Sequence, residues 1–170
     1  APGEKKFDFD VNQISITPKR QKVADFSAPY YTAPQAVLAR KGTAPANAKT
    51  LEDLTDVKLG VQVGTTSLQA VNDVIKPQQP PQVFNDSNDL VAALKSGRID
   101  AVVVDLPTAI YLRDAVVDDT VVVGQFDLPS GGDRWGALLA KNSKLTACVT
   151  QAVEALRKSG ELQTLTDKWM

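Results

Sequence analysis

The chain has 170 residues, enough for one ordinary domain or two small lobes, and 43% of them are hydrophobic, so a core can pack without disulfides. The 19 basic and 20 acidic residues give a net charge of −1, which argues against nucleic acid as a partner because that ligand requires a basic surface. One cysteine and no histidine leave zinc sites and Ser-His or Cys-His catalysis without their usual residues. No apolar run is long enough to cross a bilayer and no segment has the parts of a signal peptide, so we expect a mature exported protein or a cytosolic one.

The first predicted elements are two strands separated by a polar turn. Residues 7–16 alternate between apolar and polar side chains, which predicts a strand, and residues 35–40 predict a second one. Between them, the stretch ISITPKRQKVADFSAPYY places Arg20 in a short polar turn directly after the first strand. The composition of residues 41–50 is typical of a linker.

The middle of the chain alternates between strand-like and helix-like segments. The expected strands are 58–63, 80–85, 99–105 and 120–126, and the expected helices are 65–75, 87–97 and 106–115. The helix at 87–97 has a Ser or Asn cap and a terminal glycine, and 99–105 is a nearly continuous apolar run typical of a strand buried on both faces. This order predicts an α/β fold with a mainly parallel sheet and flanking helices.

The C-terminal part returns to a strand and two helices. Residues 134–140 predict a strand after the linker-like stretch 128–133, and residues 143–158 and 161–170 predict helices. Cys148 falls on the expected apolar face of the first of these helices, which predicts a buried and inert thiol.

The polar turn holds the first candidate for ligand binding. Arg20 presents a rigid fork of donors that matches a carboxylate, and Ser15, five residues earlier, can add a hydroxyl donor. The alternative is a surface arginine in a polar turn, and the spacing alone favours that alternative.

Two further candidates lie at the ends of predicted strands. In VQVGTTS, at 61–67, the chain turns at Gly64 and a helix begins whose N–H groups attract anions; the alternative is an ordinary N-cap by Thr65 or Thr66. Asp105 ends the most apolar strand, where it can hold an ammonium group or cap the following helix. An anion site and a cation site together indicate a zwitterion, and an α-amino acid is the simplest such ligand.

The same residues carry a family resemblance. ITPKR followed by VADFSAPYY, GTTS after a strand, SGRIDAVVVD and the closing KSGELQTLTDKW resemble, in order and spacing, the polar amino-acid solute-binding proteins of ABC transporters. The resemblance covers nearly the whole chain. It implies a periplasmic-binding-protein-like fold, in which two α/β lobes joined by crossover strands close on the ligand.

The resemblance also implies roles for individual residues. Arg20 corresponds to the arginine that grips the ligand α-carboxylate, and Ser15 corresponds to its hydroxyl helper. The backbone of Gln13 lies where a carbonyl meets the α-ammonium group, and Asp105 corresponds to the aspartate that binds this ammonium group.

From the opposite lobe, the resemblance assigns Thr66, with the Thr65 region, to the helix-start donors for the carboxylate. Gln62 occupies a position that faces the ligand side chain. We expect no metal, no cofactor and no catalytic residue. The identity of the amino acid does not follow from the sequence.

The chain departs from the family in one respect. The signature arginine lies well inside the family's chains but close to the first residue here. We therefore expect a complete second lobe at 33–132 and a partial first lobe, with the crossover segments, at 1–32 and 133–170. We also expect the partial lobe to expose apolar surface, which a homodimer partner or a separate lobe-one fragment would cover.

The implied function is to bind an L-amino acid between two lobes and to deliver it to an ABC transporter permease, without catalysis, in the periplasm or another extracytoplasmic space. The alternatives are a cyclohexadienyl or arogenate dehydratase on the same fold and a ligand-sensing module of a receptor. The enzyme would need an acid or base in its cleft. The glutamates, however, are predicted in flanking turns or surface helices, at Glu4, Glu52, Glu154 and Glu161.

Overall fold

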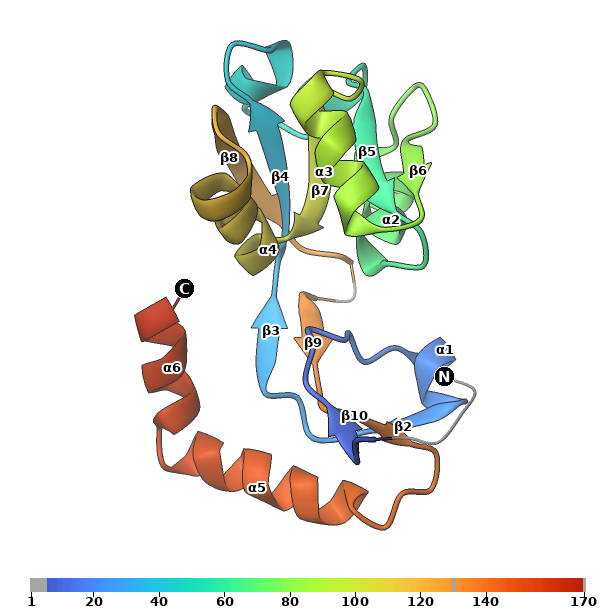
Figure 1. Ribbon diagram of the computed structural model, residues 1–170, viewed down its shortest axis with the longest axis vertical. Helices are drawn as coiled ribbons and strands as arrows, with labels where there is room; N and C mark the ends of the chain where they lie inside the picture. Colours follow the sequence, from blue (N-terminus) through green and yellow to red (C-terminus); the bar gives the residue numbers. More distant parts are fainter. Residues whose placement is uncertain (1–5, 130, 170) are drawn as a thin grey trace. The chain divides into compact units, whose positions relative to one another are not determined.

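The structure, a computed structural model, describes residues 6–129 and 131–169 and forms two compact units (Figure 1). Unit 1 consists of Ala1–Thr32 together with Arg134–Met170, and unit 2 is the continuous segment Ala33–Asp133. The chain therefore passes between the units twice. That unit 2 is a complete lobe and unit 1 a partial one stays a prediction.

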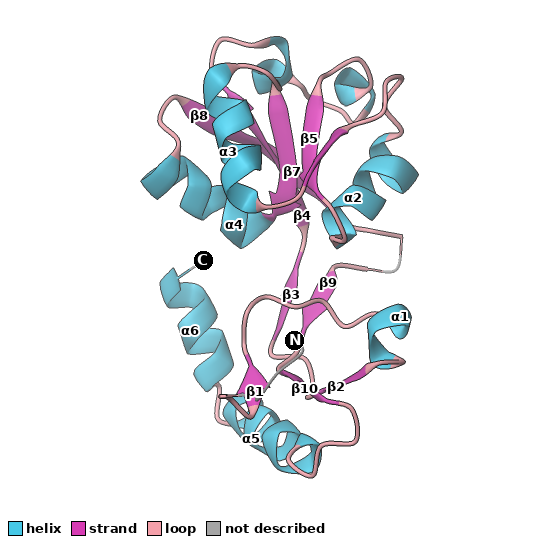
Figure 2. Cartoon of the chain, turned by 45° about the vertical axis from the view of Figure 1, so that its right-hand side comes forward, coloured by secondary structure: helices cyan, strands magenta, loops and turns pink. Residues whose placement is uncertain are grey.

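Unit 2 is built on a five-stranded sheet with the strand order β6-β5-β7-β4-β8. Figure 2 shows helices α3 and α4 on one side of this sheet and α2 on the other. The strands are β4 (Gln35–Arg40), β5 (Leu59–Gln62), β6 (Gln82–Phe84), β7 (Ala101–Asp105) and β8 (Thr120–Phe126). The helices are α2 (Thr66–Ala70), which continues as a π-helix at Val71–Ile75, α3 (Ser87–Ser96), and α4 (Leu106–Tyr111), which continues as a π-helix at Leu112–Val116. Short 3₁₀-helices occupy Ala44–Asn47 and Glu52–Leu54. The predicted alternation of strands and helices is present.

One strand gives this sheet a mixed character. β5 pairs in parallel with β6 and with β7, whereas β4 lies between β7 and β8 and is antiparallel to both. β5, β6, β7 and β8 therefore run in one direction and β4 runs against them. The sheet is α/β and mainly parallel in strand direction, as predicted, with one reversed strand that the sequence pattern did not indicate.

The central strands of the sheet in unit 2 are buried on both faces. Along β4, Ala36 and Leu38 pack into a cluster with α3 and α4, and Val37 and Ala39 pack into a second cluster with α2 and its π-helical continuation. Because successive side chains of a strand point to opposite faces, a strand covered on both sides must be apolar throughout. This explains the continuous apolar runs in the sequence.

The ends of α3 depend on two residues. Asp86, rather than the predicted Ser or Asn, is the cap, and its carboxylate accepts hydrogen bonds from the N–H groups of Asn88 and Asp89 at 2.8 and 3.0 Å. The helix ends at Gly97, whose φ of 76° is left-handed and suits glycine. Aspartate, serine and asparagine are comparable caps, so the sequence NDSN did not distinguish among them.

Unit 1 contains a small antiparallel sheet and helices. The sheet has the order β1-β10-β2, with β1 at Phe9–Asp10, β2 at Ala24–Phe26 and β10 at Leu138–Ala140. β3 (Tyr31–Ala33) and β9 (Asp133–Trp135) pair with each other where the chain passes between the units. The helices are α1 (Pro18–Gln21), α5 (Thr146–Lys158) and α6 (Glu161–Trp169).

The first predicted strand is wrong over most of its length. Of residues 7–16, Phe9–Asp10 forms a strand, and Ser15 makes an isolated bridge with Trp135. The extended path is interrupted because Gln13 adopts a left-handed φ of 53°.

The predicted strand at 134–140 is two strands, β9 and β10, separated at Gly136. The chain is crowded there, because a Cβ added to Gly136 would lie 2.9 Å from Ile16 Cδ1 and 3.1 Å from the carbonyl oxygen of Ser27. Only a residue without a side chain allows this close approach.

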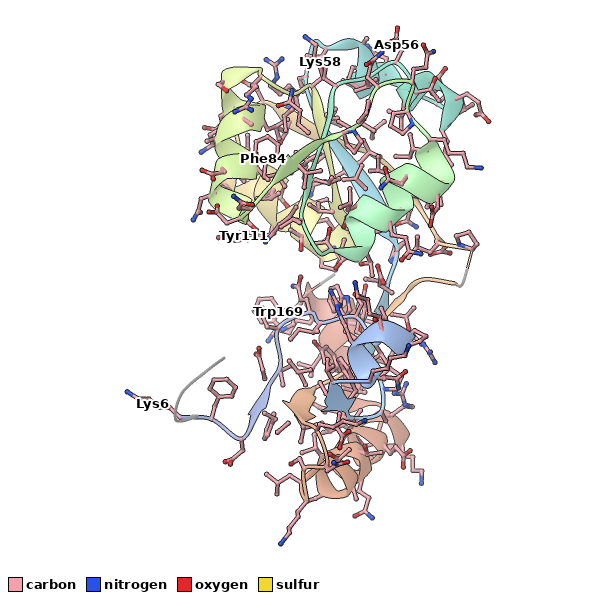
Figure 3. The ribbon with its side chains drawn as sticks, turned by 90° about the vertical axis from the view of Figure 1, so that its right-hand side faces the viewer. Lys6, Asp56, Lys58, Phe84, Tyr111 and Trp169 are labelled. Carbon is pink, nitrogen blue, oxygen red and sulfur yellow. The ribbon has the colours of Figure 1, made fainter. Side chains whose placement is uncertain are left out.

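Unit 1 buries less of its apolar surface than the helical pattern predicts. Cys148 is exposed, so the predicted burial of its thiol is wrong. Within the described residues, Val153 is the buried side chain of α5, and α6 has none. Large apolar side chains are exposed in this unit at Phe7, Phe9, Val11, Val23, Leu145, Leu156, Leu165 and Trp169, and in unit 2 at Val63, Val83 and Tyr111. Figure 3 labels Trp169 and Tyr111 among them. Among the described helices, none combines the length and the apolar composition that a membrane crossing requires.

Candidate functional site

In unit 1, Arg20 lies in the short helix α1, whose start is fixed by local contacts. Thr17 is the N-cap, and its hydroxyl accepts a hydrogen bond from the Arg20 N–H at 3.2 Å, while Pro18 occupies the first helical turn. The half-buried Arg20 side chain donates through Nη1 to the carbonyl oxygen of Ser15 at 2.9 Å. The guanidinium is therefore held in place, which argues against a loose surface arginine.

Two other predicted residues, Ser15 and Gln13, lie in the same unit as Arg20. Ser15 is buried at 3% exposure, and the N–H of Gln13 donates to the Tyr30 hydroxyl at 3.2 Å. Burial raises the pKa of Tyr30 above its ordinary value of 10.0, so this hydroxyl stays protonated at neutral pH. The left-handed backbone of Gln13 costs about 1–3 kcal/mol, and strain of this kind clusters at ligand sites.

In unit 2, the turn between β5 and α2 carries the next predicted residues. Thr65 is the N-cap of α2, and its hydroxyl accepts from the Leu68 N–H at 3.2 Å and donates to the Gln62 carbonyl oxygen at 2.7 Å. Thr65 is therefore the N-cap of α2, as the alternative predicted, and its ligand role stays a prediction. The Gln62 side chain accepts a hydrogen bond from the Ser87 hydroxyl at 2.9 Å, which ties the turn to the start of α3.

The conformation of this turn depends on Gly64. Its φ of 73° is left-handed, so another residue would be strained there even though nothing lies within 4 Å of an added Cβ. Thr66 is the first residue of α2 and is buried at 9% exposure. The turn thus presents the start of α2 at the end of β5, as the sequence predicts.

Asp105 lies at the C-terminal end of β7. Its backbone takes the N-cap position of α4, but its side chain makes no capping hydrogen bond, so the capping alternative is wrong for the carboxylate. Instead, Oδ1 of Asp105 accepts from Nε2 of Gln35 at 2.5 Å, and the same Nε2 donates to Oδ2 of Asp133 at 2.6 Å. One neutral amide therefore lies between two carboxylates.

The structure gathers the predicted residues into two groups, one in each unit. Unit 1 holds Gln13, Ser15 and Arg20, and unit 2 holds Gln62, Thr65, Thr66 and Asp105. In unit 2, β5 and β7 are neighbouring parallel strands, so their carboxyl ends share the sheet edge at which open α/β sheets bind ligands. The ligand roles of all these residues stay predictions.

Two other features of the described residues do not involve the predicted ligand residues. No group of His, Cys, Asp or Glu among them is placed to hold a metal ion. A hollow of about 290 Å³ in unit 2 is lined by residues of β4, β8 and the segment 48–54, and by none of the predicted ligand residues.

A sequence profile of the bacterial extracellular solute-binding proteins, family 3, matches residues 1–170. The chain belongs to this family. This chain is 32% identical over 166 residues to the L-cystine-binding protein TcyJ of Escherichia coli K12, and the match covers 97% of this chain and 60% of TcyJ. It is 29% identical over 179 residues to the arginine-binding extracellular protein ArtP of Bacillus subtilis, covering 97% of this chain and 64% of ArtP. The chain thus spans 60% to 64% of the length of these two curated relatives.

Solved structures resemble the solute-binding protein over nearly its whole length. An ancestral arginine-binding protein bound to arginine has a TM-score of 0.77 and 34% identity, covering 97% of this chain and 72% of its own. The ancestral amino acid-binding protein AncCDT-1, a precursor of cyclohexadienyl dehydratase, has a TM-score of 0.76 and 35% identity, and the match covers 96% of this chain and 68% of AncCDT-1. The predicted periplasmic-binding-protein-like fold is confirmed.

Proposed function

We propose that this solute-binding protein binds an L-amino acid between its two lobes and delivers it to the permease of an ABC transporter, without catalysis, in an extracytoplasmic space. The observation that carries the proposal is a pair of oriented charges: the Arg20 guanidinium on the Ser15 carbonyl, and the Asp105 carboxylate on the Gln35 amide. A free amino acid carries one carboxylate and one ammonium group, and charge-assisted hydrogen bonds are the strong ones for holding each. The relatives named for cystine and arginine support an amino acid as the ligand.

The neighbouring residues complete the proposed site. Ser15 adds a hydroxyl for the ligand carboxylate, and the start of α2 at Thr65 and Thr66 adds donors for the same group. The carbonyl of Gln13 accepts from the ammonium group. Gln62, at the end of β5, faces the ligand side chain.

A thermal-shift panel tests this proposal on the 170-residue chain. The panel contains the common L-amino acids, L-cystine and L-ornithine. A ligand at 100 times its Kd stabilises the folded state by about 2.7 kcal/mol, so binding should raise the Tm for one member or for a related group. Asp105→Ala should abolish the shift, and Asp127→Asn, which removes an exposed carboxylate of unit 2, should retain it. A panel without any shift would show that the proposal is wrong.

A dehydratase is the second candidate, because the fold resembles that of AncCDT-1, described as a precursor of cyclohexadienyl dehydratase. The positions of the glutamates count against it. Glu52, Glu154 and Glu161 are exposed, and Glu4 lies outside the described residues. Incubation of the chain with prephenate and with arogenate distinguishes the two functions, since any catalysed turnover would favour the enzyme.

We further propose that a second copy of the chain, or a separate lobe-one fragment, covers the exposed apolar surface of unit 1. Phe9 on the two-residue strand β1 and Leu165 and Trp169 on α6 belong to this surface. Exposed apolar side chains of this kind can take part in interaction sites, and β1 is an edge strand whose outer side can pair with another chain.

A further inference from the structure

We infer that Gln35 is a positioning residue for amino-acid binding: its side-chain amide holds the Asp105 carboxylate for the ligand ammonium group and links it to Asp133. The inference rests on the proposed function and adds to it a residue that does not touch the ligand. It is carried by the position of Gln35 in the sheet, by its hydrogen bonds and by its lack of charge.

The sheet register places Gln35 beside Asp105. Gln35 is the first residue of β4, Asp105 is the last residue of β7, and the two are directly opposite in the antiparallel ladder. Residues that are directly opposite extend their side chains on the same face of the sheet and contact each other. The Leu106 N–H donates to the Pro34 carbonyl oxygen at 2.9 Å, which fixes the backbone next to both residues.

Burial and hydrogen bonding leave the Gln35 amide one orientation. The side chain is 1% exposed, and both hydrogens of Nε2 are used, for Asp105 Oδ1 at 2.5 Å and for Asp133 Oδ2 at 2.6 Å. The opposite amide orientation would place Oε1 against two carboxylates, which also have only acceptors when ionised. The carboxylate of Asp105 is therefore held by a group that is itself fixed.

The buried amide of Gln35 is destabilising in one respect, so packing alone does not explain why a glutamine occupies this position. Oε1 of Gln35 is buried and has no hydrogen-bond partner among the described residues, and a buried acceptor without a partner is destabilising. The other residues of β4 are apolar up to Arg40, so an apolar side chain would suit this position. The amide therefore contributes its hydrogen bonds to the carboxylates of Asp105 and Asp133, which an apolar side chain could not make.

The absence of charge on the amide suits a cationic ligand. An arginine or lysine at position 35 would hold Asp105 equally well, but it would also neutralise the carboxylate and compete with an ammonium group. The glutamine orients Asp105 and leaves its negative charge in place. The neighbouring Asp133 adds a second negative charge to the same region, which favours a cation.

The experiment compares Gln35→Met with Gln125→Met. Methionine keeps the length of the side chain and removes the amide, and Gln125 is an exposed residue of the adjacent strand β8 that serves as the matched control. Calorimetry gives the Kd of each variant for the amino acid with the largest thermal shift in the panel. It also gives the Kd for the same molecule without its α-amino group, which is 5-guanidinopentanoate if L-arginine is selected.

We expect the preference for the amino acid over its deaminated analogue to fall about tenfold in Gln35→Met and to stay unchanged in Gln125→Met. An equal loss for both ligands would indicate a purely structural role and would overturn the inference. If Gln35→Met fails to fold, Asp133→Asn keeps an acceptor for the amide and removes the second charge. The preference should then fall by a smaller factor, and an unchanged preference would again overturn the inference.

A ligand-free measurement separates failure of this inference from failure of the proposed function. In the unsubstituted chain, the side-chain amide protons of Gln35 should exchange with solvent far more slowly than those of Gln125. The ¹³C signal of the Asp105 carboxyl should move in Gln35→Met and not in Gln125→Met. If the unsubstituted chain binds no amino acid, the proposed function and the ligand role of Gln35 both fall. If it binds one while the carboxyl signal does not move, the positioning role alone is wrong.

Discussion

Replacing Arg20 with alanine should weaken amino-acid binding by about 1.5–3 kcal/mol, the range for a hydrogen bond to a charged group. That range corresponds to a rise in Kd of roughly 10- to 150-fold. We expect a loss of binding free energy in the upper part of this range, because Arg20 is half-buried and its 2.9 Å hydrogen bond to the Ser15 carbonyl already orients it. Ligand binding therefore costs little additional conformational entropy of this side chain. The loss should appear for every amino acid that the protein binds, because the proposed contact is with the α-carboxylate, which all amino acids share.

Isothermal titration calorimetry on the parent chain and three variants tests this reasoning. Arg20→Lys keeps the charge but not the planar fork, so its Kd should lie between those of the parent and Arg20→Ala. Lys19→Ala removes an exposed positive charge from the same helix and should bind as the parent does. The carboxylate assignment is refuted if Arg20→Ala binds as tightly as the parent. Equal weakening by Lys19→Ala would instead point to a general charge effect.

Three further predictions concern stability and assembly. Gly60→Ala should lower the free energy of unfolding by about 1–3 kcal/mol in urea titrations, because the added Cβ would lie 2.3 Å from Cδ1 of the buried Ile99. Gly124→Ala is the control and should change the free energy of unfolding little, because nothing lies within 4 Å of its added Cβ. Equal effects of the two substitutions would contradict the packing argument. The hydrogen bond from Lys141 holds the pKa of Asp25 in the folded protein below its ordinary value of 3.8. The ion pair therefore stabilises the fold at pH values above 3.8, and this stabilisation is lost as the pH falls through the pKa that Asp25 has in the folded protein. Asp25→Asn should therefore lower the Tm at pH 7 and converge with the parent in acid, whereas a constant difference across the pH range would be inconsistent with this linkage. Light scattering should show an assembly larger than the monomer. A monodisperse species of 18.2 kDa, with its C-terminal helices protected from hydrogen exchange, would show that unit 1 is stable without a partner on its exposed apolar surface.

The fold could be predicted best where strands are covered on both faces. The bounds of β4 match the predicted segment 35–40, because a strand covered on both faces is a nearly continuous apolar run between polar turns. The bounds of the edge strand β8 also match the predicted segment 120–126, although its last residues are more exposed. The prediction failed in unit 1, where strands are short and their ends depend on tertiary contacts. Nothing in the residue pattern indicates that Gln13 adopts a left-handed conformation, since glutamine rarely does so.

The candidate site was predictable where chemistry and local position coincide. Arg20 lies in a short helix that begins at the sequence Thr17-Pro18, Thr65 caps a helix and Asp105 ends a strand, and each of these positions can be recognised from neighbouring residues. Gln35 was missed, although it is the first residue of a correctly predicted strand. Its partner Asp133 lies 98 residues away in the chain, and the two meet only after β7, β4 and β9 have taken their places.

The bond between Gln35 and Asp133 also fastens the beginning of unit 2 to its end. The chain enters through β3 and leaves through β9, and these two strands pair, so both ends of a hundred-residue body emerge at one place. A gene segment that encodes such a body can be exchanged between related genes without changing the path of the flanking chain, because the two junctions stay adjacent. Recombination at these junctions would transfer Gln62 and Asp105 as a set and leave Arg20 behind. Under the proposed function, exchange of this segment would change the residue proposed to face the ligand side chain and would leave Arg20, the proposed carboxylate partner of unit 1, unchanged.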